Sequence, residues 1–84
     1  MEIQQIKYFI NVARYKSFTQ AAAKLFVTQP MLTRVIKQLE AELGVKLIER
    51  TSKYFRLTDA GELFYQKAER FLLEYDDMFY SIKD

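Results

Sequence analysis

The chain has 84 residues, with 13 Lys and Arg against 11 Asp and Glu, which gives a formal net charge of +2. It contains no Cys and no His, which excludes disulfide scaffolds, thiol nucleophiles, zinc ribbons and any triad or metal site built on imidazole. Half of its residues are apolar and it has only two Gly and one Pro, so we expect one folded, mostly α-helical domain. No apolar run approaches the roughly 20 residues of a membrane span, and the first residues lack the pattern of a secretory signal.

The small net charge conceals an uneven distribution. Residues 1–57 carry ten basic and four acidic side chains, a net charge of +6, whereas residues 58–84 carry three basic and seven acidic ones, a net charge of −4. This asymmetry is typical of a chain whose first part contacts a polyanion. Solvated faces that differ by chance are the alternative, and charge alone leaves both open.

The first two predicted elements are short helices. An apolar stripe predicts a helix from Ile3 to Arg14; it consists of Ile3, Ile6, Ile10 and Ala13, with Phe9 beside it. A second helix is expected over about 18–25. Its start is indicated by Ser17 and Gln20, which have the spacing of a capping box, with Thr19 as a competing cap. Its run of three alanines predicts close approach of a neighbouring helix.

The third predicted helix has the clearest ends. Thr28 is a suitable N-cap, and Pro30 stands in the first turn, where its missing N–H costs nothing. Its apolar positions follow helical spacing and are Leu32, Val35, Ile36, Leu39 and Leu43. Gly44 follows at the position of a left-handed C-cap.

A β-hairpin and a long helix are predicted to follow. The segments 46–50 and 54–57 have β-type composition and flank a polar, basic tip, with one of Tyr54 and Phe55 facing inward. Thr58 and Asp59 then begin a helix that runs to about Lys83. Its heptad seam consists of Phe64, Ala68, Phe71, Tyr75, Met78 and Ile82. At 1.5 Å per residue the helix is roughly 37 Å long, so we expect its first two turns to lie on the domain and the rest of the seam to bind a partner. A helix that lies wholly across the domain is the alternative.

This order of elements is that of a winged helix-turn-helix, a three-helix core with a hairpin wing, followed by a long helix. In that layout the third helix, over about 29–43, enters the major groove, and the wing, over about 46–57, lies at the flanking minor groove and phosphates. The expected DNA-contacting residues are Thr28, Gln29, Pro30, Met31, Thr33, Arg34, Lys37, Gln38, Arg50 and Lys53. Gln, Arg and Thr are side chains that read base edges, while Lys37 and Arg50 suit phosphate.

We find no constellation for catalysis, metal binding or a cofactor. The pairs Glu40/Glu42 and Asp76/Asp77 are not on matched helix faces, and Asp59-Ala60-Gly61-Glu62 lacks the lysine and spacing of a phosphate loop. The chain is therefore predicted to bind and not to act as an enzyme.

The same residues resemble the N-terminal domain of LysR-type transcriptional regulators over essentially the whole chain. The resemblance lies in Tyr8-Phe9, Ser17-Phe18-Thr19-Gln20-Ala21-Ala22, Val27-Thr28-Gln29-Pro30, the run from Leu32 to Glu40, the run from Leu43 to Arg50, and Leu57-Thr58-Asp59-Ala60-Gly61. It implies that Gln29, Pro30, Thr33 and Arg34 contact DNA from the recognition helix, and Arg50 and Lys53 from the wing. Phe26 departs from the family, which often has a polar residue or His there.

The resemblance also implies a bacterial regulator of the cytoplasm and nucleoid. It implies binding to an interrupted, A/T-rich inverted repeat as a homodimer with antiparallel linker helices. It further implies that the longer parent protein forms a tetramer and contacts RNA polymerase. A separate C-terminal domain of that parent would bind a small-molecule inducer. We therefore expect a fragment made of a DNA-binding part, 1–58, and a linker helix, 59–84. The alternatives are a winged helix used for protein–protein contact and the DNA-binding domain of another winged-helix regulator, such as the molybdate-responsive type.

Overall fold

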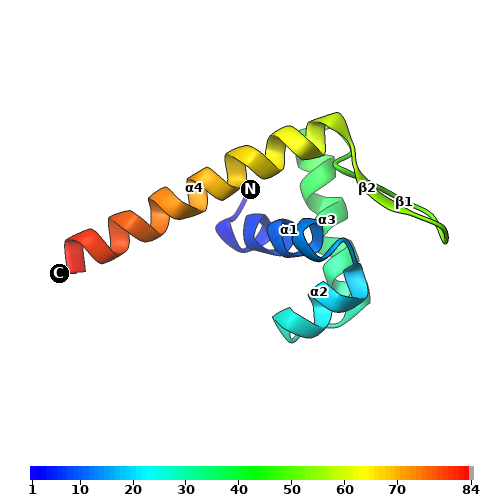
Figure 1. The fold of residues 1–84 in the computed structure, drawn as a ribbon, viewed down its shortest axis with the longest axis horizontal. Coiled ribbons are helices and arrows are strands. Elements are labelled where there is room, and N and C mark those ends of the chain that lie inside the picture. The colour runs from blue at the N-terminus through cyan, green and yellow to red at the C-terminus, as the bar shows by residue number, and fades with distance from the viewer. Residues whose placement is uncertain (84) are drawn as a thin grey trace.

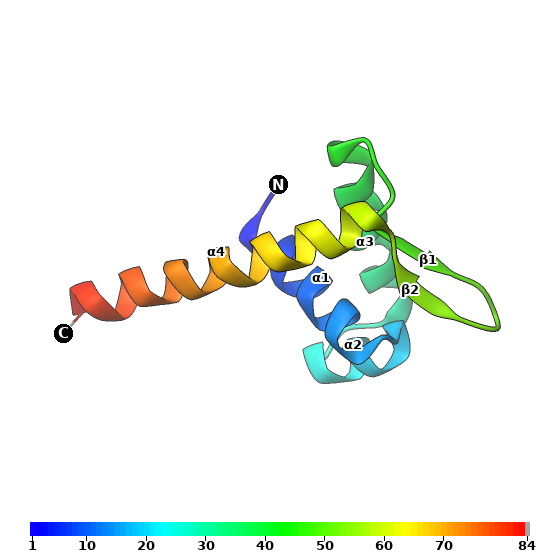
Figure 2. The ribbon, with the colours of Figure 1, turned by 45° about the horizontal axis from the view of Figure 1, so that its top comes forward.

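The computed structural model describes residues 1–83 and consists of four helices and one two-stranded hairpin. The elements in chain order are α1 (Ile3–Tyr15), α2 (Phe18–Leu25), α3 (Gln29–Leu43), β1 (Ile48–Arg50), β2 (Phe55–Leu57) and α4 (Asp59–Lys83). Figures 1 and 2 show α1, α2 and α3 gathered into one body, with the hairpin at one end. Helix α4 runs over α1 and extends beyond the body at the opposite end. The architecture is the expected winged helix-turn-helix followed by a long helix.

The predicted helix ends are confirmed where short-range chemistry determines them. The Ser17 hydroxyl accepts from the Gln20 amide at 3.1 Å, and the Thr28 hydroxyl accepts from the Met31 amide at 3.2 Å. Gly44 ends α3 with φ +74°, as the C-cap prediction required. Only one half of the capping box at Ser17 is present, since no hydrogen bond from the Ser17 amide to the Gln20 side chain occurs among residues 1–83.

The core lies where the three helices and the base of the hairpin meet. Phe9, Val12, Leu32, Leu39 and Leu47 are its most completely buried large side chains. Ala21 and Ala22 of α2 are buried against them, so small side chains do allow the close helix approach that the alanine run predicted.

The turn that leads from α2 to α3 contains Phe26 in the left-handed region, with φ +59°.

The strands are shorter than predicted, because the first residues of the predicted segment 46–50 are bonded to α3 and not to the second strand. β1 and β2 are antiparallel, with Ile48 opposite Leu57 and Arg50 opposite Phe55. Where β1 begins, the Glu40 carboxylate accepts from the amides of Leu47 and Ile48 at 2.8 and 3.2 Å. These bonds hold the base of the hairpin to α3. As predicted, one aromatic faces inward: Phe55 packs on the core and Tyr54 is exposed.

Helix α4 packs on the body for longer than its first two turns. Phe64 meets Phe9 edge to face at 5.1 Å, and Ala68 is buried against Ile6 and Ile10 of α1. Leu72 is the last half-buried side chain, and every described residue after it is exposed. The division expected after residue 58 therefore does not separate two cores, because residues 59–72 complete the core of the helical body.

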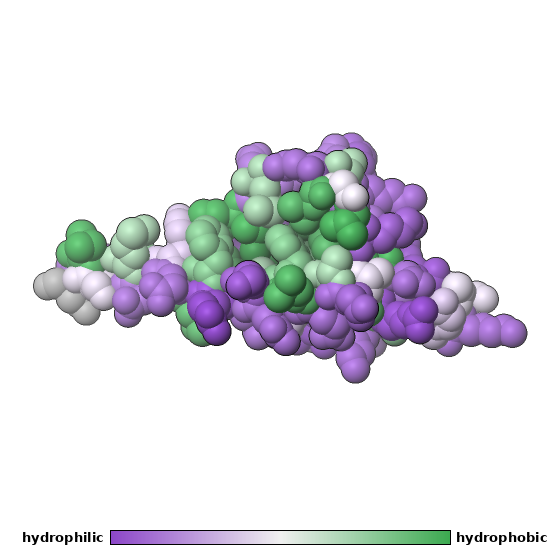
Figure 3. Space-filling view, turned by 90° about the horizontal axis from the view of Figure 1, so that it is seen from above, coloured by the Kyte–Doolittle hydropathy of each residue, from purple (hydrophilic) through white to green (hydrophobic). Residues whose placement is uncertain are grey.

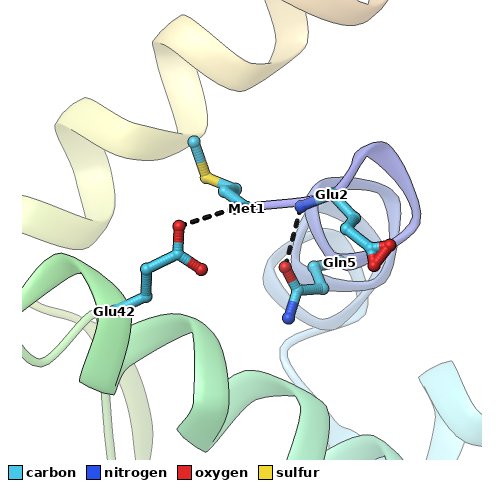
Figure 4. Close-up of polar contacts among 4 residues, drawn as sticks. All are labelled: Met1, Glu2, Gln5 and Glu42. Carbon is cyan, nitrogen blue, oxygen red and sulfur yellow. Dashed lines mark hydrogen bonds and ion pairs between the residues drawn. The ribbon is translucent and has the colours of Figure 1, made fainter.

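The first residues are fastened to the end of α3. The α-amino group of Met1 forms an ion pair with Glu42 at 2.6 Å, and the Glu2 amide donates to the Gln5 side chain at 2.8 Å (Figure 4). Both contacts lie at the surface. The ion pair ties the start of the chain to α3 and adds little to stability, because exposed ion pairs are weak.

Candidate nucleic-acid interface

Helix α3 has one buried and one open face. Leu32, Ile36 and Leu39 are buried, whereas the opposite side carries polar and basic side chains. A shallow surface hollow on that side is lined by Gln29, Pro30, Thr33, Arg34, Lys37, Gln38 and Ala41. The structure thus brings six of the predicted contact residues onto one accessible surface.

The start of α3 has the polarity that favours an anion. Its first turn contains no acidic residue, and Pro30 lies at its N-terminal end. The positive end of the helix dipole is therefore not neutralised by the chain itself. Thr28 contributes differently from its neighbours, because its hydroxyl already caps the helix. Met31 is 38% exposed and does not line the hollow.

The wing tip presents Lys53. The Thr51 amide donates to the Tyr54 carbonyl at 2.9 Å, and the Lys53 amide donates to the Thr51 hydroxyl at 3.1 Å. None of these residues has a positive φ, so the tip turns without glycine. Lys53 is exposed and has no ion pair among residues 1–83. Its charge is available to an external anion.

Both arginines of the wing have partners inside the chain. The Arg50 guanidinium lies over the Phe18 ring at 3.9 Å and donates to the Thr33 hydroxyl at 3.4 Å. Arg56 pairs with Glu49 at 3.3 Å and lies 5.4 Å from the Tyr54 ring. Sequence reasoning gave Arg50 a role at phosphate and missed its partner, Phe18. No short-range pattern connects the start of α2 to the wing.

A second surface feature, between α1 and α4, was not expected. It is a groove of about 770 Å³ whose polar lining includes Lys7, Asn11, Arg14, Glu69 and Asp76. Arg14 pairs with Glu69 at 3.6 Å. A side-chain hydrogen bond with Tyr65, helped by the charge of Glu69, raises the pKa of Arg14 above its ordinary value. The Arg14 guanidinium therefore keeps its charge beside Glu69 in this groove.

The predicted dimerisation seam divides into two parts. Phe64 and Ala68 are covered by the chain's own α1, so Ala68 is only 4% exposed. Phe71, Tyr75, Met78 and Ile82 are exposed, from 38% at Tyr75 to 83% at Ile82. Figure 3 shows apolar side chains gathered over the middle of the molecule and continuing along the extended helix. Leu73 and Tyr80, outside the predicted seam, and Phe79, on the row that adjoins it, are also exposed.

Comparison with known proteins identifies this arrangement. Residues 3–62 match the family described as "Bacterial regulatory helix-turn-helix protein, lysR family". The chain belongs to the LysR family. The match extends from the first residue of α1 into the first turn of α4, so it includes the whole helix-turn-helix and the wing.

Relatives within the LysR family are transcriptional regulators. The chain is 45% identical over 78 residues to the HTH-type transcriptional regulator BenM of Acinetobacter baylyi, a match that covers 93% of this chain and 26% of BenM. It is also 45% identical over 74 residues to the regulator AlsR of Bacillus subtilis, covering 88% of this chain and 24% of AlsR. The chain thus spans about a quarter of the length of these curated relatives.

Solved structures of LysR-family proteins share the fold closely. BenM_DBD in its complex with catB site 1 DNA matches with a TM-score of 0.95 and 43% identity, over 99% of this chain and 93% of that one. CbnR_DBD in its DNA complex matches with a TM-score of 0.94 and 41% identity, over 99% and 95% of the two chains. Full-length BenM matches with a TM-score of 0.94 and 43% identity, over 28% of its length.

Two further features complete the description of this LysR-family chain. Across residues 1–83, none of the helices combines the length and apolarity that a membrane crossing requires. Within the same residues, no three or more acidic side chains are grouped so as to hold a metal ion.

Proposed function

We propose that the chain binds double-stranded DNA sequence-specifically as a homodimer and so regulates bacterial transcription at an interrupted, A/T-rich inverted repeat. The observation that carries this proposal is the likeness to BenM_DBD, which was crystallised on DNA, at a TM-score of 0.95. The open face of α3 supports it, because that face carries side chains suited to base edges and phosphates.

The proposed roles follow the positions of the residues. Gln29, Thr33, Arg34 and Gln38 read base edges in the major groove, Lys37 and Lys53 contact phosphate, and Pro30 and Met31 supply apolar contact. Thr28 holds the start of α3 toward the backbone of the duplex. The proposed activity is binding and involves no catalysis, cofactor or metal ion.

The proposed dimer surface consists of the exposed members of the seam, Phe71, Tyr75, Met78 and Ile82. Exposed apolar and aromatic side chains at heptad spacing are the usual means by which two helices pair. We propose that α4 pairs with α4 of a second copy while its residues 59–72 remain packed on their own helical body.

The longer relatives suggest the remaining partners. We infer that the chain works in the bacterial cytoplasm, at the nucleoid, because a regulator of transcription must reach the chromosome. A further domain for a small-molecule inducer, a tetrameric assembly and contact with RNA polymerase are proposed for a protein of the relatives' full length.

The proposal is tested by selecting preferred duplexes from a random-sequence DNA pool and then titrating a selected duplex at several salt concentrations. We expect affinity to fall steeply and linearly with salt on logarithmic axes, because phosphate contacts release counterions. A scrambled duplex of the same composition is the control and should bind more weakly. A flat salt response, or equal affinity for both duplexes, would contradict the proposal. Sedimentation of the complex gives the number of chains per duplex.

A further inference from the structure

Resting on the proposed DNA binding, we propose that Arg50 is a positioning residue of the wing. Its guanidinium joins the hairpin to both helices of the helix-turn-helix, through Phe18 at the start of α2 and Thr33 in the second turn of α3. Lys53 at the tip is then the wing cation that contacts phosphate.

The strand register directs Arg50 toward the helices. Side chains alternate between the two faces of a strand, so Arg50 shares its face with Ile48, which is buried, and with its cross-strand neighbour Phe55. Glu49 and Arg56 pair with each other on the opposite face. Arg50 therefore extends along the inner side of the hairpin, where a phosphate contact would have to compete with its intramolecular partners.

Phe18 is the common contact of both strands. Arg50 of β1 lies over its ring at 3.9 Å, and Phe55 of β2 meets it edge to face at 6.2 Å. Phe18 is itself buried directly after the N-cap Ser17, so it is a fixed platform. A planar guanidinium can stack on such a ring and donate a directed hydrogen bond at the same time, which an ammonium does less well.

Arg50 and Phe55 attach the hairpin to the body near its tip, whereas the hairpin backbone is fastened at its base. There the Thr58 amide donates to the Leu47 carbonyl at 3.0 Å, and the Glu40 carboxylate holds the amides of Leu47 and Ile48. Each strand is three residues long, and an isolated hairpin of this size is marginally stable in water. The contact of Arg50 lies at the far end of β1, next to the tip, so it fixes the angle at which Lys53 is presented.

The hydrogen bond to Thr33 also affects the recognition helix. The Thr33 hydroxyl oxygen accepts from Arg50, which leaves the hydroxyl hydrogen free to be donated. Arg50 therefore directs the hydroxyl of a proposed base-reading residue as well as the wing. The helix and the wing are therefore held in one arrangement in the free protein, and binding DNA costs less conformational entropy.

Arg50→Lys tests the proposal, since it keeps the charge and removes the flat, forked group. In the free protein we measure amide hydrogen exchange in the wing, above all at Thr51, whose amide closes the turn. With the selected duplex we measure affinity against salt. We expect Arg50→Lys to speed wing exchange and to weaken binding about tenfold, from the lost stacking and hydrogen bond, with the salt slope unchanged.

Lys53→Ala is the matched comparison. It should lower the salt slope by about one and leave wing exchange as in the wild type. Phe18→Leu, which changes no charge, should behave like Arg50→Lys, and combining the two should add little further loss. The thermal melt of Phe18→Leu shows whether this variant folds. If it does not, the proposal is tested by comparing Arg50→Lys with Arg50→Ala.

Three results would overturn the proposal. Wild-type exchange and affinity in Arg50→Lys, with a reduced salt slope in Arg50→Ala, would make Arg50 a phosphate contact. Faster wing exchange without loss of affinity, or loss of affinity without faster exchange, would separate wing position from binding. The exchange measurement needs no DNA, so a failure of the DNA-binding proposal would be visible separately, in a wild type that does not prefer the selected duplex.

Discussion

Gly61, in the first turn of α4, lies directly against the backbone of Leu47 at the base of the wing. A Cβ atom at position 61 would overlap the Leu47 carbonyl oxygen, and that oxygen also accepts from the Thr58 amide at 3.0 Å. The amide of Gly61 in turn donates to the Thr58 hydroxyl at 2.9 Å. The long helix, the wing and the core are therefore joined at a single point where only a hydrogen atom fits.

Gly61→Ala should destabilise the fold. In most helix positions this change is favourable by about 1 kcal/mol, but here the backbone of Leu47 must move. Overpacking of this kind costs about 1–3 kcal/mol, which should lower the urea midpoint and the melting temperature. Gln66→Ala, on an exposed position of the same helix, is the control and should change little. A melting temperature equal to the wild type's in Gly61→Ala would show that α4 does not approach Leu47 so closely.

Phe26 is expected to weaken the fold by its backbone conformation. It has φ +59° and is 94% exposed. The left-handed conformation is therefore unfavourable, and burial of the ring does not offset it. Phe26→Gly should stabilise the chain by about 1 kcal/mol, and Phe26→Asn by somewhat less. The measurement is the free energy of unfolding from urea titration.

Phe26→Ala separates backbone from side chain. Alanine removes the ring and keeps the strain, so its stability should equal that of the wild type within a few tenths of a kcal/mol. If Ala loses stability, the ring makes a contact in solution that supports the fold. If Gly gives no gain, the turn between α2 and α3 is not strained.

The parts of the structure that the sequence predicts best are those set by neighbours in the chain. Ser17, Thr28 and Gly44 mark helix ends because a cap needs only the amides or carbonyls of the adjacent turn. Long apolar periodicity likewise identifies α3 and α4. Phe26 shows the limit of this reasoning, since a left-handed residue is recognisable only when it is glycine or asparagine.

Contacts between distant segments account for what the sequence did not predict. Arg50 was recognisable as a cation of the wing, but its place over Phe18 depends on the strand register and on the approach of α2. The length of α4 that packs on the body depends on α1, which covers Ala68 with Ile6 and Ile10. Neither relationship has a pattern at fixed spacing, because the partners come from separate elements.

Charge introduced into the exposed seam should separate the proposed dimer. Phe71→Glu or Met78→Glu would place a carboxylate where two apolar helix faces meet, and an unpaired buried charge costs several kcal/mol. Sedimentation equilibrium should show a shift from dimer to monomer, with helicity retained by circular dichroism. Leu73→Glu, on the opposite side of α4, is the control and should leave the dimer intact. The reverse outcome, with only Leu73→Glu giving monomers, would move the interface to the other face.

Arg34→Ala tests the recognition helix. Arg34 is exposed on the open face of α3 and has no ion pair among residues 1–83, so its guanidinium is available for a bidentate bond to a guanine. The selected duplex should bind about 1–3 kcal/mol more weakly, and preference over other bases at the contacted position should be relaxed. Lys37→Ala should instead weaken binding to all duplexes alike and lower the salt slope by about one, as expected of a phosphate contact.

Arg70→Ala is the control for the loss of one arginine charge. Arg70 lies on an exposed position of α4, away from α3 and the wing, so its removal should change affinity only through weak long-range attraction. Equal losses from Arg34→Ala and Arg70→Ala would mean that net charge, and not the face of α3, determines binding. A loss at Arg34 that is uniform across sequences would reassign this residue from base reading to phosphate contact.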